Sequence, residues 1–287
     1  MMNKKDLYRR LNQFVQDPFV APLKQYQPAL STKAMWKLRY ASAARGIPLT
    51  SNERRIGLHK DVHKGRRAFL IGNGPSLNQL DLTLLKNEIT FGVNGIYLAR
   101  DKMGFLPTHY IVEDFFVAED RADEINKLEG TTKWFGNYLR YCLRDGPHTN
   151  WINILVDYRN FADFPHFSED IRRRVWVGGT VSFIGMQLAF YMGVSELVLI
   201  GFDHSYVIPD HVEKTRNDLM SHGDDPNHFH PDYFGKGYRW HDPMVGRMEQ
   251  AYRKAARHYH QHDRRILNAT AGGHLEVFPR VDYTSLF

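Results

Sequence analysis

The stretch Arg67–Leu80, RAFLIGNGPSLNQL, indicates how this chain folds. An apolar run leads into a turn with two glycines and a proline, and the leucines that follow recur with helical spacing. This order predicts a strand, a tight turn and a helical segment. Glycines without a Cβ let a ligand approach the backbone, and the N–H groups at a helix start favour an anion. We therefore expect a phosphate-binding turn, although a plain βα turn fits the same pattern. Its residues are Gly72, Asn73, Gly74, Pro75 and Ser76.

Further apolar runs predict the other strands, and helical stretches fall between most of them. The runs are Ile89–Val93, His109–Val112, Lys133–Gly136, Trp151–Val156, Leu197–Ile200 and Arg264–Asn268. Such alternation predicts an α/β, Rossmann-like domain over residues 65–287, with a doubly wound, mostly parallel sheet. Residues 1–64 are rich in Lys, Arg and aromatic residues and contain no strand-like run. We expect them to form a helical, basic N-terminal extension.

The composition limits the class of protein. The chain has 287 residues, of which 43% are hydrophobic, enough for one large α/β domain with an appendage. It lacks an apolar run of the ~20 residues that span a membrane, its N-terminus is charged rather than apolar, and Cys142 is its only cysteine. We therefore expect a cytoplasmic protein without an internal disulfide.

The formal net charge of +6 suits an anionic substrate. It also suits an acidic membrane surface, which the basic N-terminus could contact peripherally. The basic residues are scattered, and the sequence has no zinc-finger, helix-turn-helix or RNP pattern. Nucleic acid is therefore not expected as a partner.

Small and polar residues follow the predicted strands, where ligands bind in sheets of this kind. A buried helix beginning near Val181 has a glycine pair before it, so its N-terminus is a second candidate anion site. Each feature also has a structural explanation, because glycines permit close helix packing and an aspartate can cap a turn. We expect them to converge on one cleft. The residues are Asn94, Glu113, Asp114, Gly178, Gly179, Thr180, Asp203 and His204.

Residues 221–242 are long, rich in polar and aromatic side chains, and free of periodicity. Loops of this length in compact domains are often lids. We expect a lid whose aromatic rings stack on a sugar or base. The histidines and aspartates of this segment match no zinc template, so metal binding is the weaker alternative. The residues assigned to the lid and substrate are Tyr206, His228, His230, Tyr233, Tyr238 and Trp240.

Asp242 and Pro243 predict the N-cap and first turn of an amphipathic helix that ends near Gln261. His241 would then lie at the positive end of this helix, which favours the neutral imidazole that a proton acceptor needs. We assign His241 as the candidate general base, followed by His204 and Asp203 as catalytic candidates. A histidine that only hydrogen-bonds the capping region fits the pattern equally well.

An ordered series of motifs resembles the MptE-like family. The motifs are FLIGNGPSL, FGVNGIYL, GGTVSFIGMQLAFYMG, LVLIGFDHSY, DDPNHFHPDYFGKGYRWH and NATAGGHLEVFPRVDY, spread over roughly residues 64–287. This family is named for a 6-hydroxymethylpterin diphosphokinase and includes the motility accessory factor proteins implicated in flagellin glycosylation. It is similar to single-domain bacterial sialyltransferases.

The resemblance implies a nucleotide site and a base. Its nucleotide-binding positions correspond to Gly72, Asn73, Gly74, Asn94, Gly179 and Thr180, and His241 corresponds to the sialyltransferase general base. Glu113 and Asp114 stand where those enzymes have an asparagine after the third strand. This departure bears on the identity of the donor.

Three functions remain. The first is a glycosyltransferase without a required cofactor, which moves a sugar from a nucleotide-linked, CMP-type donor to a glycan or glycoprotein acceptor in surface polysaccharide or glycoprotein synthesis. The second is a diphosphokinase that transfers pyrophosphate from ATP to a hydroxymethylpterin-type alcohol. It needs Mg²⁺, with Glu113, Asp114 and Asp203 as candidate ligands. The third is a nucleotide-binding module without catalysis.

Overall fold

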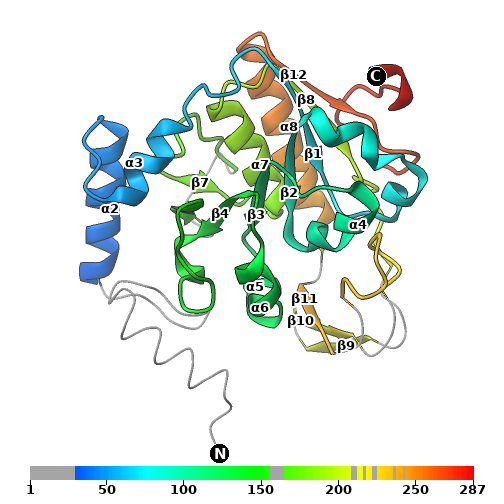
Figure 1. Ribbon diagram of the computed structural model, residues 1–287, viewed down its shortest axis with the longest axis horizontal. Helices are drawn as coiled ribbons and strands as arrows, with labels where there is room; N and C mark the ends of the chain where they lie inside the picture. The colour runs from blue at the N-terminus through cyan, green and yellow to red at the C-terminus, as the bar shows by residue number, and fades with distance from the viewer. Residues whose placement is uncertain are drawn as a thin grey trace, which may run out of the picture.

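The centre of the molecule is a seven-stranded sheet with the strand order β12-β8-β1-β2-β3-β4-β5 (Figure 1). The computed structural model describes residues 30–155, 165–207, 212–215, 218–221, 225–234, 237–241 and 243–287. All neighbouring strands in this sheet are parallel, which confirms the α/β, Rossmann-like prediction. The strands are β1 (Arg67–Ile71), β2 (Ile89–Val93), β3 (His109–Val112), β4 (Thr132–Gly136), β5 (Thr149–Ile152), β8 (Glu196–Ile200) and β12 (Arg265–Asn268).

The strand order reverses at β1. The chain runs outward from β1 through β2 to β5, then returns to place β8 on the other side of β1 and β12 beyond it. Both faces of β1 are covered, so Ala68–Ile71 are fully buried, as a continuous apolar run predicts. In sheets of this type the ligand crevice lies at the carboxyl ends of the strands beside such a reversal.

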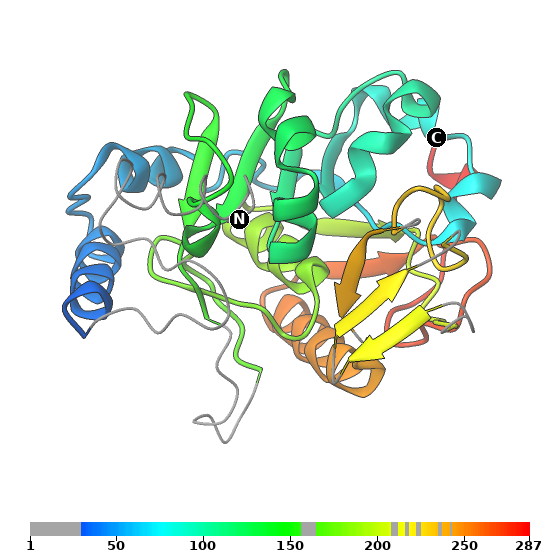
Figure 2. The same ribbon diagram turned by 90° about the horizontal axis from the view of Figure 1, so that it is seen from below.

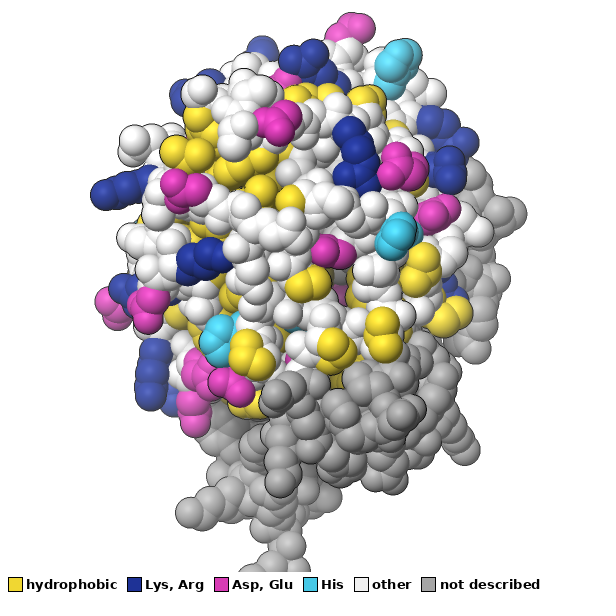
Figure 3. Space-filling view, turned by 90° about the vertical axis from the view of Figure 1, so that its right-hand side faces the viewer, with side chains coloured by type: hydrophobic (Ala, Val, Ile, Leu, Met, Phe, Trp, Pro, Cys, Tyr) yellow, Lys and Arg dark blue, Asp and Glu magenta, His cyan; other side chains and the backbone are white. Residues whose placement is uncertain are grey.

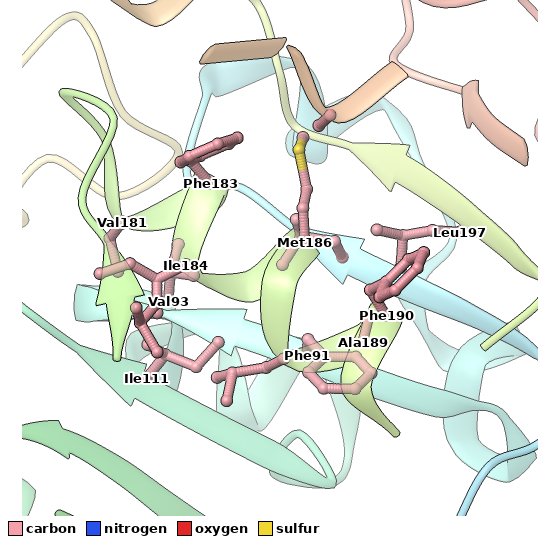
Figure 4. Close-up of a cluster of buried hydrophobic side chains, with 14 of the residues drawn as sticks. Phe91, Val93, Ile111, Val181, Phe183, Ile184, Met186, Ala189, Phe190 and Leu197 are labelled. Carbon is pink, nitrogen blue, oxygen red and sulfur yellow. The ribbon is translucent and has the colours of Figure 1, made fainter. Parts of the chain in front are cut away.

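The long helices α7 (Val181–Tyr191) and α8 (Val245–Gln261) cover one face of the sheet. Every residue of α7 is buried, which agrees with a sequence that is apolar except for Ser182 and Gln187. Figure 4 shows Ile184 of α7 beside Val93 and Ile111 of the sheet. Because α7 leads directly into β8, its N-terminus faces the carboxyl edge of the sheet.

Short helices cover the opposite face. The helical segment predicted after the glycine turn consists of two 3-10 helices, because Leu80 is extended and the Asp81 side chain accepts a hydrogen bond from the N–H of Thr83. The elements of this layer are η1 (Pro75–Gln79), η2 (Leu82–Asn87), η3 (Asn94–Ala99), α4 (Arg100–Met103), α5 (Phe115–Asp120), α6 (Ala122–Lys127) and η4 (Asn137–Leu139). A last 3-10 helix, η5 (Thr284–Leu286), closes the chain.

The described part of the N-terminal extension is helical, as predicted. It comprises α2 (Leu30–Ala44) and α3 (Ser51–Leu58). Asn52 of α3 hydrogen-bonds both backbone groups of Trp151 in the edge strand β5, each at 2.8 Å. The extension therefore satisfies part of an otherwise open sheet edge. Residues 1–29, the first part of the basic N-terminus that could contact an acidic membrane surface, lie outside the described residues.

The expectation that residues 221–242 lack secondary structure is wrong at both ends. A three-stranded antiparallel sheet is formed by β9 (Val212–Thr215), β10 (Asp218–Ser221) and β11 (Arg239–His241). Figure 2 shows this small sheet beside α5. Strands of three or four residues are too short to show an alternation of apolar and polar side chains. They form only because separate segments of the chain pair with one another. A further short pair is β6 (Ile154–Leu155) with β7 (Val175–Trp176).

Charges of both signs are mixed on the surface that Figure 3 displays. Lys and Arg side chains alternate there with Asp and Glu, so this face carries no field of a single sign. Within the described part of the chain, no helix combines the length and apolar character that a bilayer span requires.

Candidate functional site

The glycine turn after β1 continues the pairing of β1 with β8. The N–H of Gly72 donates to the carbonyl of Ile200 at 2.8 Å, and the N–H of Gly74 donates to Gly201 at 3.0 Å. A Cβ at Gly72 would lie 2.4 Å from the Gly201 carbonyl oxygen. The glycine is therefore required first for close approach of the two strand ends. Backbone hydrogen bonds therefore close the space between the ends of β1 and β8 at Gly72 and Gly74.

The side chain of Asp203 binds to the first turn of η1. Its Oδ1 accepts from the Ser76 N–H at 3.1 Å, and its Oδ2 accepts from the Ser76 hydroxyl at 2.6 Å. Pro75 is the first residue of η1, and a Cβ at Gly74 would lie only 1.8 Å from Oδ2 of Asp203. The N–H expected to bind phosphate is thus bound to the chain's own carboxylate. A phosphate at this point would meet a negative charge unless a cation bridges the two groups.

Asn73 and Asn94 lie at the ends of the adjacent strands β1 and β2. The Nδ2 of Asn73 donates to the carbonyl of Val93 at 3.1 Å. The Oδ1 atoms of Asn73 and Asn94 are buried and make no hydrogen bond with any described residue. Asn94 also has a left-handed backbone, with a φ of 48°. Buried acceptors without partners are rare, so these two oxygens mark a place where a ligand N–H could bind.

The N-terminus of α7 is built on two left-handed glycines, Gly178 at φ 59° and Gly179 at φ 86°. The Thr180 side chain caps the helix by accepting from the N–H of Ser182 at 3.3 Å. The side chain of Arg247, in the first turn of α8, lies against Gly179, where a Cβ would be 2.9 Å from the Arg247 Cδ. Sequence reasoning missed Arg247. Its only signal was a basic residue in a first helical turn, where acidic residues are usual.

His241 does not lie at the start of α8. It ends β11, while α8 begins at Val245 with Met244 as its N-cap, so the predicted helix start was wrong. The reason is the antiparallel pairing of β11 with β10, which keeps the backbone extended through His241. Asp242, the predicted N-cap, lies outside the described residues. The helix does end at Gln261, as predicted.

The His241 ring is held from α5 instead. It stacks on Phe116 with centroids 4.5 Å apart, and its Nε2 lies 3.9 Å from Oδ2 of Asp114. The other oxygen of Asp114 caps α5 by accepting from the N–H of Phe116 at 2.7 Å. Burial raises the pKa of Asp114, and the nearby His241 opposes that rise. The separation of 3.9 Å is longer than a hydrogen bond, so Asp114 and His241 interact electrostatically, while the stacking on Phe116 holds the ring in place.

Residues 225–234 dock as a compact turn around Asp225. The Asp225 carboxylate accepts from the N–H groups of Asn227 and Phe234 at 2.9 and 3.0 Å, and it pairs with Nδ1 of His228 at 2.6 Å. The N–H of Phe229 donates to the carbonyl of Asn73 at 2.8 Å. The predicted lid therefore contacts the glycine turn directly.

The aromatic rings of this region pack largely on protein side chains. Tyr233 is buried, stacks on His228 at 4.0 Å, and its hydroxyl accepts from the N–H of Gly95 at 3.4 Å. Trp240 stacks on Phe234. Tyr238 lies under the Arg121 guanidinium, and His230 Nδ1 accepts from the N–H of Asp232. Stacking of these rings on a sugar or base stays a prediction.

His204 and Tyr206 follow β8 and lie against α8. His204 has a φ of 55°, and its buried Nε2 makes no hydrogen bond to the described residues, although Glu249 Oε1 is 3.5 Å away. Burial lowers the pKa of His204, and Glu249 opposes this shift. The hydroxyl of Tyr206 contacts Sδ of Met248 at 3.9 Å. His204 is thus available as a neutral acceptor.

The candidate magnesium ligands are not brought together. Glu113 and Asp114 follow β3, whereas Asp203 follows β8, three strands away in the sheet. At ~4.8 Å between neighbouring strands, these positions are roughly 14 Å apart. Among the described residues, the one group of three side chains whose ligand atoms could share a metal contains none of them. A single Mg²⁺ therefore does not fit all three carboxylates.

Residues 49–209 match the family described as 6-hydroxymethylpterin diphosphokinase MptE-like. The chain belongs to the MptE-like family. The matched part includes α3 and the strand-end residues from the glycine turn to Asp203, but it ends before the lid and His241. No curated protein matches this MptE-like chain.

Proposed function

We propose that this MptE-like protein is a glycosyltransferase that uses a nucleotide-activated sugar, with His241 as the general base. The observation that carries the proposal is the placement of His241, whose Nε2 is 3.9 Å from Asp114 Oδ2 and whose ring rests on Phe116. A histidine beside a partly buried carboxylate is a common arrangement for removing a proton from a hydroxyl group. Simple nucleotide binding requires no such pair.

The proposed reaction is a direct displacement. His241 takes the proton of an acceptor hydroxyl, whose oxygen forms a bond to the anomeric carbon of the donor sugar. The bond between that carbon and the phosphate oxygen breaks, and the nucleoside monophosphate leaves with the electron pair. The N-terminus of α7 and the adjacent Arg247 side chain would stabilise the departing phosphate.

The donor base is proposed to be cytosine. The unpartnered Oδ1 atoms of Asn73 and Asn94 can accept hydrogen bonds from an exocyclic amino group. Cytosine has such a group and uracil lacks it, so a CMP-linked sugar fits this pair better than a UMP- or UDP-linked one. The acceptor would be a glycan or glycoprotein that belongs to a cell-surface polymer.

The second candidate is a diphosphokinase that transfers pyrophosphate from ATP. The observation in its favour is Asp203, since a carboxylate beside the glycine turn would bind a phosphate through a bridging cation. The wide separation of the three candidate Mg²⁺ ligands counts against it. Mg²⁺ held by Asp203 alone would depend on the phosphate oxygens of ATP for its remaining ligands.

A thermal-shift matrix tests the two functions. CMP, CTP, UMP and ATP are each added with excess EDTA and, separately, with Mg²⁺, since a ligand that binds only the folded state raises the Tm. We expect CMP and CTP to raise the Tm in EDTA, with UMP weaker. A shift produced only by ATP with Mg²⁺ would replace the glycosyltransferase with the diphosphokinase. Cytidine binding without transfer from a CMP-sugar to any acceptor would favour a non-catalytic module.

A further inference from the structure

Three side chains that can each bind a metal ion lie close together at the C-terminal end of α8, far from the strand-end residues described above. His258 and His262 lie one turn apart near the C-terminus of this helix, and Glu169 approaches them from the segment before β7. At 1.5 Å per residue, His258 is roughly 20 Å along the helix from Val245. No function assigned above uses this cluster.

The ligand atoms of the cluster converge. The Oε1 atom of Glu169 lies 3.0 Å from Nε2 of His258 and 3.8 Å from Nε2 of His262. One ligand atom from each residue lies within 4.8 Å of the other two. Tetrahedral Zn²⁺ with bonds of about 2.0–2.1 Å places its ligand atoms roughly 3.3 Å apart. Small side-chain adjustments would therefore bring all three into the coordination sphere of one ion.

His258 is short of a hydrogen-bond partner. Its Nε2 is buried and, despite the 3.0 Å separation from Glu169, makes no hydrogen bond of acceptable geometry with any described residue. The ring itself is fixed, because it stacks on Phe167 at 4.3 Å and meets the edge of Phe190 at 5.1 Å. A fixed ring whose buried nitrogen faces a carboxylate at 3.0 Å, without a well-aligned hydrogen bond, can coordinate an ion held between the two groups.

The second histidine is also oriented for coordination. Nδ1 of His262 lies 2.9 Å from the carbonyl oxygen of His258, which accepts its proton and leaves Nε2 as the free lone pair. A backbone carbonyl on the remote ring nitrogen is the usual outer partner of a metal-binding histidine.

We propose that His258, His262 and Glu169 form a site for a divalent transition metal such as Zn²⁺, with water as the fourth ligand. Two imidazoles and one carboxylate suit Zn²⁺, Co²⁺ or Ni²⁺ rather than Mg²⁺. The ion would link the end of α8 to the segment that carries Phe167 and Glu169. Its effect is therefore structural, and it is independent of the proposed transfer reaction.

The test uses full-length, tag-free protein. Zn²⁺ affinity and stoichiometry are measured by competition with a chromophoric chelator, and Co²⁺ is added to look for the visible bands of a tetrahedral site. Glu169→Gln and His262→Gln remove exposed ligands without opening the core. His260→Gln, also exposed on α8 but outside the cluster, is the matched control.

We expect one tight Zn²⁺ equivalent, a Zn²⁺-dependent rise in Tm, and a loss of affinity in Glu169→Gln and His262→Gln of at least ~10–100-fold, the loss that removing an outer partner alone causes. His260→Gln should bind like the wild type. The cluster would be only an ion pair if all four proteins bound Zn²⁺ with equal affinity, or if the wild type bound it only weakly and without a defined stoichiometry, as exposed histidines do.

Discussion

Nε2 of His241 lies 3.9 Å from Oδ2 of Asp114, and the two residues come from distant parts of the chain, one from the end of β11 and the other from the N-cap of α5 after β3. The small antiparallel sheet is what carries His241 to this position. The base proposed here is therefore positioned by tertiary pairing, and its orientation depends on α5 rather than on α8.

His241→Ala should lower turnover per folded molecule by about 10²–10⁴-fold, the usual contribution of a positioned base, while nucleotide affinity stays near the wild-type value. Turnover across pH and nucleotide affinity are measured on the same preparation. A folded variant that keeps full activity and the acid limb of the pH profile would direct the search to His204, and then to Asp203.

Asp114→Asn separates orientation from folding. Asparagine caps helices about as well as aspartate, so α5 should stay intact while the charge facing His241 is lost. We expect an unchanged Tm within a few degrees and reduced turnover, by less than in His241→Ala. Normal turnover in this variant would mean that Asp114 is only a helix cap.

Gly74→Ala should destabilise the protein by about 1–3 kcal/mol, the usual cost of overpacking, because the new Cβ would lie 1.8 Å from Oδ2 of Asp203. Nucleotide affinity should fall as well. Gly57→Ala is the matched control, because Gly57 lies in the helix α3 and a Cβ at this position would meet no atom within 4 Å. That control should change stability by no more than ~1 kcal/mol, in the favourable direction. Urea unfolding measures both.

The protein should lose stability in mild acid. Burial lowers the pKa of His59, His63 and His109, and His63 and His109 share a bond between their Nε2 atoms at 2.8 Å. As the pH falls through about 6.5, these histidines take up protons in the unfolded chain before they do so in the folded state. The free energy of unfolding is therefore highest above that pH and decreases below it.

His63→Gln should flatten this acid dependence, because it removes one partly buried titrating ring and the bond to His109. Each pKa unit of difference between the two states is worth about 1.4 kcal/mol. Urea titrations from pH 8 to 5 measure the slope, with His260→Gln as the exposed control. An identical slope in His63→Gln and the wild type would assign the acid sensitivity to other groups.

Asp225→Ala should loosen the docked turn. It removes the acceptor for the N–H groups of Asn227 and Phe234 and the partner of His228, in a setting where a lost charged hydrogen bond costs about 1–3 kcal/mol. Hydrogen exchange at residues 225–234 should accelerate. Asp232→Ala is the control, because that side chain is 78% exposed. Similar exchange in both variants would contradict the role of Asp225.

Local patterns in the sequence were sufficient for the central sheet. Six of its seven strands were predicted to within about two residues, because buried parallel strands are rich in apolar residues. The run predicted at 151–156 instead divides between β5 (Thr149–Ile152) and β6 (Ile154–Leu155), which belongs to a separate sheet. The buried helix α7 and its glycine start followed from the same kind of signal. The strand-end residues could then be placed at one edge of the sheet without coordinates.

Contacts between distant segments were beyond such patterns. Asp203 was expected to be a catalytic candidate or a Mg²⁺ ligand, with capping of a turn as the alternative. Its binding of Ser76 could not be predicted, because it requires the ends of β1 and β8 to be adjacent. The pairing of β11 with β10 outweighed a good local capping sequence at Asp242 and Pro243. Arg247 had only a weak local signal and Glu169 had none, because each is brought to its neighbours by segments that only the folded chain joins.

The position of β1 between β2 and β8 also has a consequence for biosynthesis. β2 emerges from the ribosome soon after β1, but β8 follows only after more than a hundred further residues, so a strongly apolar strand keeps an unpaired edge for much of translation. Such edges recruit other nascent chains, and sheets completed by distant segments close slowly. We expect the recovery of this protein in recombinant hosts to improve with slower synthesis, lower temperature or added chaperones.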